Sequence, residues 1–448
     1  MTTKPGRCAL LRVAALVGVL TLPLAACSDG DDPSSTTTAD PTAVDTTAAL
    51  KAGGTLTVWA WEPTLEQVVA DLETAYPEVD VQLVNAGTGN DQYTALQNAI
   101  SAGKGVPDVA QIEYYALPQF ALGESLTDLT GLGAASLDST FTPGPWASVR
   151  SGGKVYGLPM DSGPMALFYN KELLDKHGLR VPTTWAEFLT TARALHAADP
   201  EAYITNDTGD AGFTTSLIWQ AGGRPYRVDG TKVTVNLQDE GSLAVADTWQ
   251  KLIDEDLLAP IGSWSDEWYQ GLGNGTIAML ATGAWMPANL ESGVPAGKGR
   301  WRVAPLPQWK AGADVSAENG GSSLAIPAAG TNKALAYAFL EYATVGAGVK
   351  ARIGAGAFPA TQADLTSAAF LNSPFAYFGG QRANQVFAHS ASTVGSGWSY
   401  LPFQVYANSI FKDTVGAAYV SDTSLKDGLK AWQDASISYG REQGFTVD

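Results

Sequence analysis

Between residues 55 and 112 the chain alternates short apolar runs with segments of helical spacing. Residues 55–61, 79–84 and 109–112 are rich in β-branched and aromatic residues, which is typical of strands. Residues 65–76 and 93–100 repeat apolar side chains at intervals of three and four, which predicts two amphipathic helices. Strands that alternate with helices of this length imply parallel crossover connections, so we expect an α/β lobe.

A polar bridge then separates two apolar runs. Residues 155–158 and 165–169 are suited to buried strands, and residues 159–164 between them contain two prolines and Gly163, which permits a turn. Such a bridge fits a crossing between two lobes, although an ordinary loop within one domain is the alternative. The length of 448 residues favours two or three cores over one.

After the bridge the pattern of helices and strands restarts. Thr184 and Glu187 have the spacing of a capping box, which predicts that a helix begins there. Further helices are predicted at residues 213–221, 243–253 and 332–342, and short strands at residues 278–281 and 323–326.

The first 26 residues have the features of an export signal. A basic start precedes an apolar run at residues 13–22, which is too short to span a bilayer. The run ends in Leu24-Ala25-Ala26-Cys27, which resembles the lipobox of bacterial lipoproteins; a secretory peptide with a chance cysteine is the alternative. We expect a signal peptide at residues 1–26, a lipidated Cys27, and a disordered tether through residue 54, because residues 27–54 are rich in Ser, Thr, Asp and Pro. The protein would then lie on the extracytoplasmic face of the cell membrane, attached only through the lipid.

Charge and motifs exclude several functions. The net charge of −18 disfavours nucleic acid and anionic lipid headgroups as partners. The three histidines are far apart in sequence, and the chain lacks a phosphate-binding loop, a nucleophile elbow and a dinucleotide fingerprint. We therefore expect no cofactor, no metal site and no catalytic residues.

Tryptophan residues at the ends of predicted strands are the strongest candidates for ligand contact. Trp61 ends a strand and is followed by Glu62, and Trp285 follows the predicted strand at residues 278–281. An aromatic face packs well on the apolar face of a sugar ring, while acids and amides bind the hydroxyl groups. In open α/β sheets, ligands bind at the carboxyl ends of the strands.

Seven short motifs follow one another in a fixed order along the chain. They are Pro107-Asp108-Val109, Tyr156-Gly157-Leu158-Pro159, Tyr169-Asn170-Lys171, Pro182-Thr183-Thr184-Trp185, Ala278-Met279, Gly283-Ala284-Trp285 and Gly320-Gly321-Ser322. In this order they resemble the family 1 extracellular solute-binding proteins, the maltose-binding-like receptors of ABC sugar importers. The resemblance runs from about residue 55 to the C-terminus.

The resemblance implies an α/β, two-lobed periplasmic-binding-protein fold (type II). Its lobes are discontinuous and are joined by crossing segments, with the ligand cleft between them. The crossings would lie near residues 160–164, 275–279 and 324–328. The first lobe would comprise residues 55–160 plus 277–326, and the second residues 165–275 plus 328–448.

The resemblance also implies the ligand-binding residues. They would be Trp61, Glu62, Glu113, Tyr114, Asp161, Trp285, Ser322, Phe358, Trp398 and Tyr400. Trp61 and Trp285 would lie on one side of the cleft and Trp398 on the other. Trp61 replaces the small polar residues of the maltose binder, which argues against maltose as the ligand.

The expected function is that of a non-catalytic, monomeric receptor. It would capture a carbohydrate, an oligosaccharide by expectation, and deliver it to the permease subunits of an ABC importer. A lipid-anchored glycoside hydrolase is the alternative, because Glu62, Glu113 and Asp161 could supply two carboxylates. A receptor for amines or metal is a third interpretation, with Tyr114-Tyr115 as its only support. The sequence does not distinguish a sugar from a polyol or a glycerophosphodiester.

Overall fold

The structure is a computed structural model that describes residues 43–206 and 210–448. The predicted signal peptide and Cys27 lie outside the described residues, as does most of the predicted tether. The described residues form one compact unit. None of the helices in the described part of the chain is long and apolar enough to cross a membrane.

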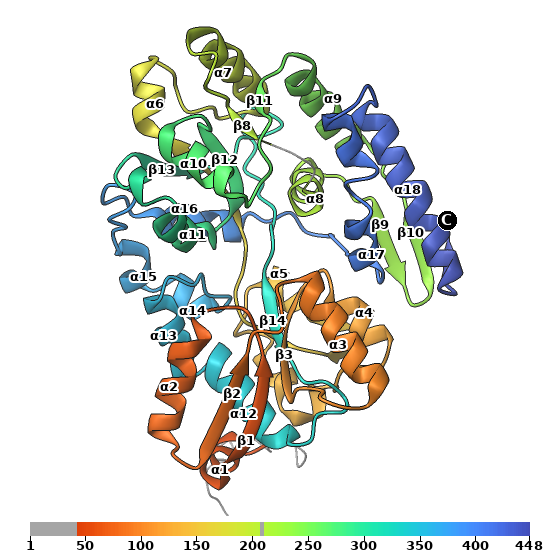
Figure 1. The fold of residues 1–448 in the computed structure, drawn as a ribbon. Coiled ribbons are helices and arrows are strands. Elements are labelled where there is room, and N and C mark those ends of the chain that lie inside the picture. The colour runs from red at the N-terminus through yellow and green to blue at the C-terminus, as the bar shows by residue number, and fades with distance from the viewer. Residues whose placement is uncertain (1–42, 207–209) are drawn as a thin grey trace, which may run out of the picture. The chain divides into compact units, whose positions relative to one another are not determined.

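The first lobe is built on a five-stranded sheet of order β2-β1-β3-β14-β6. Its strands are β1 (Gly54–Trp59), β2 (Val79–Val84), β3 (Val109–Glu113), β6 (Leu158–Pro159) and β14 (Ser322–Ala325). β1 pairs in parallel with β2 and β3, which confirms the predicted α/β pattern, and β14 returns antiparallel to β3. Figure 1 shows α2 and α3 flanking β1, β2 and β3.

Among the described residues, seven α-helices belong to this lobe, together with two short 3-10 helices at Thr130–Leu132 and Ala134–Leu137. The α-helices are α1 (Thr46–Ala52), α2 (Leu65–Ala75), α3 (Asn90–Ala102), α4 (Leu117–Leu122), α5 (Pro143–Ser148), α12 (Lys333–Thr344) and α13 (Ala347–Gly354). Buried side chains of the sheet, such as Val58 and Leu324, share one hydrophobic cluster with Leu335 and Phe339 of α12.

Helix α1 corrects the predicted end of the tether. The side chain of Asp45 accepts a hydrogen bond from the Ala48 N–H and caps the helix. Leu50 is buried in the hydrophobic cluster of the first lobe. The folded lobe therefore begins before residue 54, because one leucine and one cap are enough to fix a short helix against α12.

The second lobe is built around a three-stranded sheet of order β12-β7-β13. β12 (Met279–Gly283) and β13 (Trp301–Pro305) both pair antiparallel with β7 (Met165–Asn170). Successive side chains of β7 point to opposite faces, so Met165 and Leu167 join one hydrophobic cluster while Ala166 and Phe168 join another.

Most of the remaining elements belong to the second lobe. The strands are β8 (Thr205–Asn206), β9 (Tyr226–Asp229), β10 (Lys232–Val235), β11 (Leu258–Ala259) and β15 (Thr446–Val447), and a hairpin of β4 (Arg150–Ser151) and β5 (Lys154–Val155) belongs to the first lobe. The helices are α6 (Lys171–Lys176), α7 (Trp185–Ala198), α8 (Ala211–Gln220), α9 (Glu240–Asp254), α10 (Asp266–Asn274), α11 (Met286–Gly293), α14 (Gln362–Leu365), α15 (Ala368–Asn372), α16 (Ala383–Ser392), α17 (Gln404–Ser409) and α18 (Leu425–Glu442). The Thr184 hydroxyl accepts from the Glu187 N–H and caps α7, as predicted.

The hydrophobic clusters correct the predicted lobe boundaries. Residues 277–283 belong to the second lobe, because β12 pairs with β7, so no crossing lies at residues 275–279. Residues 324–328 lie inside the first lobe, and α12 and α13 also pack there rather than in the second lobe. The chain passes between the clusters at residues 160–165, again at residues 317–324, and again after α13.

Candidate functional site

A cavity of about 960 Å³ is lined by residues of both lobes. Nine of the ten predicted site residues line it: Trp61, Glu62, Glu113, Tyr114, Asp161, Trp285, Ser322, Phe358 and Tyr400. Trp398 lines a second cavity of about 1120 Å³ instead. Tyr114 and Tyr400 line both cavities.

A buried glutamine positions the loop that follows β1. The Oε1 atom of Gln111 accepts hydrogen bonds from the N–H groups of Trp61 and Glu62, each at 3.1 Å. Its Nε2 atom donates to Ser322 Oγ at 3.1 Å. Gln111 was not among the predicted site residues; its signal was a polar side chain inside a predicted buried strand.

Glu113 ends β3 and faces the cavity. The Tyr93 hydroxyl donates to its Oε2 atom at 2.9 Å and accepts from its backbone N–H at 3.0 Å. Burial raises the pKa of Glu113 to about 7, and the charges of Asp161 and Asp210 add to this rise. The hydrogen bonds from Tyr93 and Tyr115 oppose it.

Asp161 lies on the first crossing segment. Its Oδ1 atom accepts from the Ser322 N–H at 2.6 Å, and its carbonyl oxygen accepts from the Tyr114 hydroxyl at 2.6 Å. Burial raises the pKa of Asp161 to about 6, although the nearby charge of Arg352 favours the ionised form. Gly321 has a φ of +106°, and a Cβ there would come within 2.5 Å of the Tyr114 ring, so this close packing requires glycine.

Three tryptophans of the second lobe form an aromatic wall. The ring centroid of Trp264 lies 5.0 Å from that of Trp268 and 5.6 Å from that of Trp285. Trp285 donates from Nε1 to the Asn319 carbonyl oxygen at 2.6 Å, which fixes its ring. Trp264 was not predicted as a site residue, yet its side chain lines the cavity and the residue is 48% exposed.

The other predicted aromatic residues have different surroundings. Phe358 is buried and packs on Phe370, so it is a core residue that reaches the edge of the cavity. Trp398 stacks on Trp219 with ring centroids 5.0 Å apart. Trp398 and Trp285 both belong to the second lobe and Trp61 to the first, so the predicted grouping of these three tryptophans is wrong.

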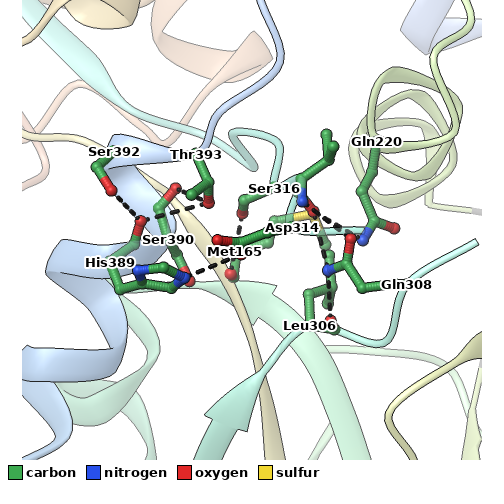
Figure 2. Close-up of polar contacts among 11 residues, drawn as sticks. Met165, Gln220, Leu306, Gln308, Asp314, Ser316, His389, Ser390, Ser392 and Thr393 are labelled. Atoms are coloured by element: carbon green, nitrogen blue, oxygen red, sulfur yellow. Dashed lines mark hydrogen bonds and ion pairs between the residues drawn. The ribbon is translucent and has the colours of Figure 1, made fainter. Parts of the chain in front are cut away.

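The loop that follows α16 is tied to the segment before the second crossing (Figure 2). The Ser316 N–H donates to the Thr393 carbonyl oxygen at 2.9 Å, and Ser316 Oγ donates to the Met165 carbonyl oxygen at 3.2 Å. His389 Nε2 lies 2.9 Å from Asp314 Oδ1. These contacts fix the start of a loop whose residues 394–400 line the second cavity, with Tyr400 also lining the first.

Glu318 links the first two crossing segments. Its carboxylate accepts from Ser162 Oγ at 3.1 and 3.2 Å and from the Gly163 N–H at 2.6 Å. The neighbouring Asn319 N–H donates to the Gly163 carbonyl oxygen at 2.8 Å. Burial raises the pKa of Glu318 to about 7.

Within the described residues, no group of histidine, cysteine and acidic side chains could hold a metal ion. The cavity instead combines aromatic faces with carboxylate, amide and hydroxyl groups. Such a surface suits a ligand that has apolar ring faces and many hydroxyl groups.

Comparison with known proteins gives consistent matches. Residues 60–348 match the sequence model of the bacterial extracellular solute-binding proteins. The chain is 26% identical over 306 residues to an arabinooligosaccharide-binding protein of Bacillus subtilis, covering 65% of this chain and 70% of that protein. It resembles the structure of an ABC transporter associated binding protein from B. animalis subsp. lactis in complex with β-1,6-galactobiose, with a TM-score of 0.83 and 46% identity over 88% of this chain and 100% of that one. A galacto-N-biose/lacto-N-biose I-binding protein from Bifidobacterium longum, in complex with lacto-N-biose, gives a TM-score of 0.78 and 26% identity over 88% and 99% of the two chains.

Proposed function

The chain belongs to the bacterial extracellular solute-binding protein family, and we therefore propose that it captures an oligosaccharide and delivers it to the permease subunits of an ABC importer. The two-lobed type II fold predicted for this family is confirmed. The proposed ligand site is the cavity of about 960 Å³ that both lobes line.

The observation that carries this proposal is the pairing of two kinds of surface. The second lobe presents the tryptophan wall, and the first presents Glu62, Glu113 and Asp161 at strand ends and on the crossing. A sugar held between them would pack a ring face on tryptophan and donate its hydroxyl hydrogens to the carboxylates. The structure with β-1,6-galactobiose, at 46% identity, supports a disaccharide or short oligosaccharide as ligand.

A thermal-shift screen over β-1,6-galactobiose, lacto-N-biose, lactose and arabino-oligosaccharides tests the proposal. A sugar at one hundred times its Kd should stabilise the protein by about 2.7 kcal/mol and so raise its Tm. Product analysis of the same mixtures should show intact sugars. Cleavage of any sugar would favour the glycoside hydrolase, and the absence of a shift with every sugar would contradict a carbohydrate receptor.

We also propose that Cys27 carries a lipid anchor, on the basis of Leu24-Ala25-Ala26-Cys27. In a bacterium that processes lipoproteins, the full-length protein should fractionate with membranes, because a diacylglyceryl group with a further acyl chain anchors stably. Cys27→Ser should move the protein to the medium without changing its affinity for sugar. Retention of the variant in the membrane fraction would refute the anchor.

A further inference from the structure

All charged side chains that line the proposed sugar cavity are acidic, within the described part of the chain. They are Glu62, Glu113 and Asp161 from the first lobe and Asp210 from the second. The three residues between Asn206 and Asp210 in the sequence include no lysine or arginine. The second cavity differs, because Arg150 and Lys154 are among the residues that line it.

The four carboxylates act on one another across the cavity. The charges of Asp161 and Asp210 both disfavour ionisation of Glu113, and the charge of Glu62 disfavours ionisation of Asp161. They therefore create a single region of negative potential to which both lobes contribute.

The cation that acts on Asp161 does not reach the ligand space. Arg352 is 2% exposed and is absent from the lining of the cavity. Its Nε atom donates to Thr64 Oγ1 at 3.3 Å, and its Nη1 atom donates to the Met160 carbonyl oxygen. Arg352 thus supports the crossing segment from behind, and its Nη2 atom, which has no hydrogen-bond partner, is buried away from the cavity.

A hydroxyl group and an anionic group of a ligand interact differently with the four carboxylates of the cavity. A sugar hydroxyl donates its hydrogen to a carboxylate, whereas the ionised carboxylate of a uronate or the sulfate group of a sulfated sugar has no hydrogen to donate. Closure of the cavity around a ligand would also remove water and so strengthen the repulsion between like charges. We propose that the cavity selects neutral glycans over acidic glycans and that the four carboxylates cause this selection. The inference rests on the proposed function, since it assigns the ligand class of the same site.

Three matched ligands test the proposal by calorimetry at pH 7.5. They are β-1,6-galactobiose, the same disaccharide with its non-reducing galactose oxidised to galacturonate, and the uronamide of that acid. The uronamide has nearly the shape of the uronate but is neutral, and its N–H groups can donate to a carboxylate. The ratio of their Kd values therefore measures how strongly the site prefers a neutral donor group to an anion of the same shape. We expect the uronate to bind at least about tenfold more weakly than the uronamide.

Two variants assign the effect to the carboxylates. The Phe213 N–H donates a hydrogen bond to Asp210 Oδ1 at 3.0 Å. Asp210→Asn keeps an oxygen that can accept this bond and removes one negative charge. It should reduce the uronate-to-uronamide ratio several-fold, whereas Glu240→Gln, an exposed acid in the first turn of α9, should leave the ratio unchanged.

Equal affinity for the uronate and the uronamide would overturn the proposal. An unchanged ratio in both Asp210→Asn and Glu62→Gln would also overturn it, because the discrimination between the two compounds would then not come from these carboxylates. If none of the three compounds bound and no sugar in the thermal-shift screen stabilised the protein, the proposed function itself would fail.

Discussion

At the scale of single residues, Gln111 holds together parts of the site that are distant in sequence. Its side-chain amide accepts hydrogen bonds from two backbone N–H groups that follow β1. The same amide donates to the hydroxyl of Ser322, which lies 211 residues later in the sequence. Gln111 is 1% exposed and lies at the base of the cavity that it lines. The position of Trp61 and Glu62 in the cavity thus depends on one buried polar group.

Replacement of Gln111 should therefore affect both stability and binding. Gln111→Leu leaves two backbone donors without their acceptor, and each buried unsatisfied group costs about 1–3 kcal/mol. We expect the free energy of unfolding in urea to fall by about 2–4 kcal/mol. At a pH low enough to keep the buried carboxyl group protonated, Gln111→Glu retains an acceptor for both N–H groups and should be less destabilising; equal losses in the two variants would then contradict this role.

Trp285 is the residue whose loss should weaken sugar binding most directly. Trp285→Ala should reduce affinity by about 2–4 kcal/mol, as removal of a central aromatic contact does. Trp285→Phe keeps a ring but loses the hydrogen bond to Asn319, so it should have a smaller effect. Trp309 packs on Trp185 outside the cavity, and Trp309→Phe should leave calorimetric affinity unchanged. A site elsewhere would be indicated by wild-type affinity in both Trp285 variants.

At the scale of elements, local patterns predicted β1–β3 and α7 well. The apolar runs of the strands and the cap of the helix are formed by residues close together in sequence. The partner of β12 could not be predicted in this way. β12 pairs antiparallel with β7, more than a hundred residues earlier, and a short apolar strand does not encode its partner. Helix α1 was missed for a related reason. Its single buried leucine stabilises the helix only by packing toward α12, which is distant in sequence.

The buried carboxyl group between the crossing segments should make stability depend on pH. The folded state raises the pKa of Glu318 from 4.5 to about 7, so between these values the folded protein holds a proton that the unfolded chain has released. Stability should therefore fall as the pH rises from about 4.5 to 7, on the order of 1–3 kcal/mol from this group. The raised pKa values of Glu113 and Asp161 should also lower stability as the pH rises. The contribution of Glu318 is therefore measured by comparing the wild type with Glu318→Gln.

Urea unfolding at several pH values measures the free energy of unfolding of the wild type and of Glu318→Gln. The curve for Glu318→Gln should fall less steeply with pH, because the amide still accepts from Ser162 and Gly163 but cannot ionise. Parallel curves for the two proteins would show that Glu318 does not titrate in this range.

At the scale of the whole molecule, the cavity needs both lobes. Neither the tryptophan wall nor the acidic surface encloses a ligand alone, and paired segments at Gly163 and Asn319 connect the two. The order of motifs predicted the two-lobed organisation. Nine of the ten residues that it suggested line the cavity, and their contact with a ligand stays a prediction. The exact lobe boundaries were not predictable, because they depend on which sheet each returning strand joins.

We predict that ligand closes the two lobes by a rotation about the crossing segments. Small-angle scattering should show a smaller radius of gyration with saturating sugar, to the extent that the sugar binds the closed form more tightly. An added Cβ at Gly163 would lie 2.2 Å from the Asn319 carbonyl oxygen, so Gly163→Ala must displace the paired segments although Gly163 does not line the cavity. This variant should change affinity and the scattering difference, whereas Gly273→Ala in α10, where the nearest atom lies at 3.5 Å, should change neither. An identical scattering curve with and without a sugar known to bind would refute closure, and wild-type affinity in Gly163→Ala would show that these segments do not set the balance between open and closed forms.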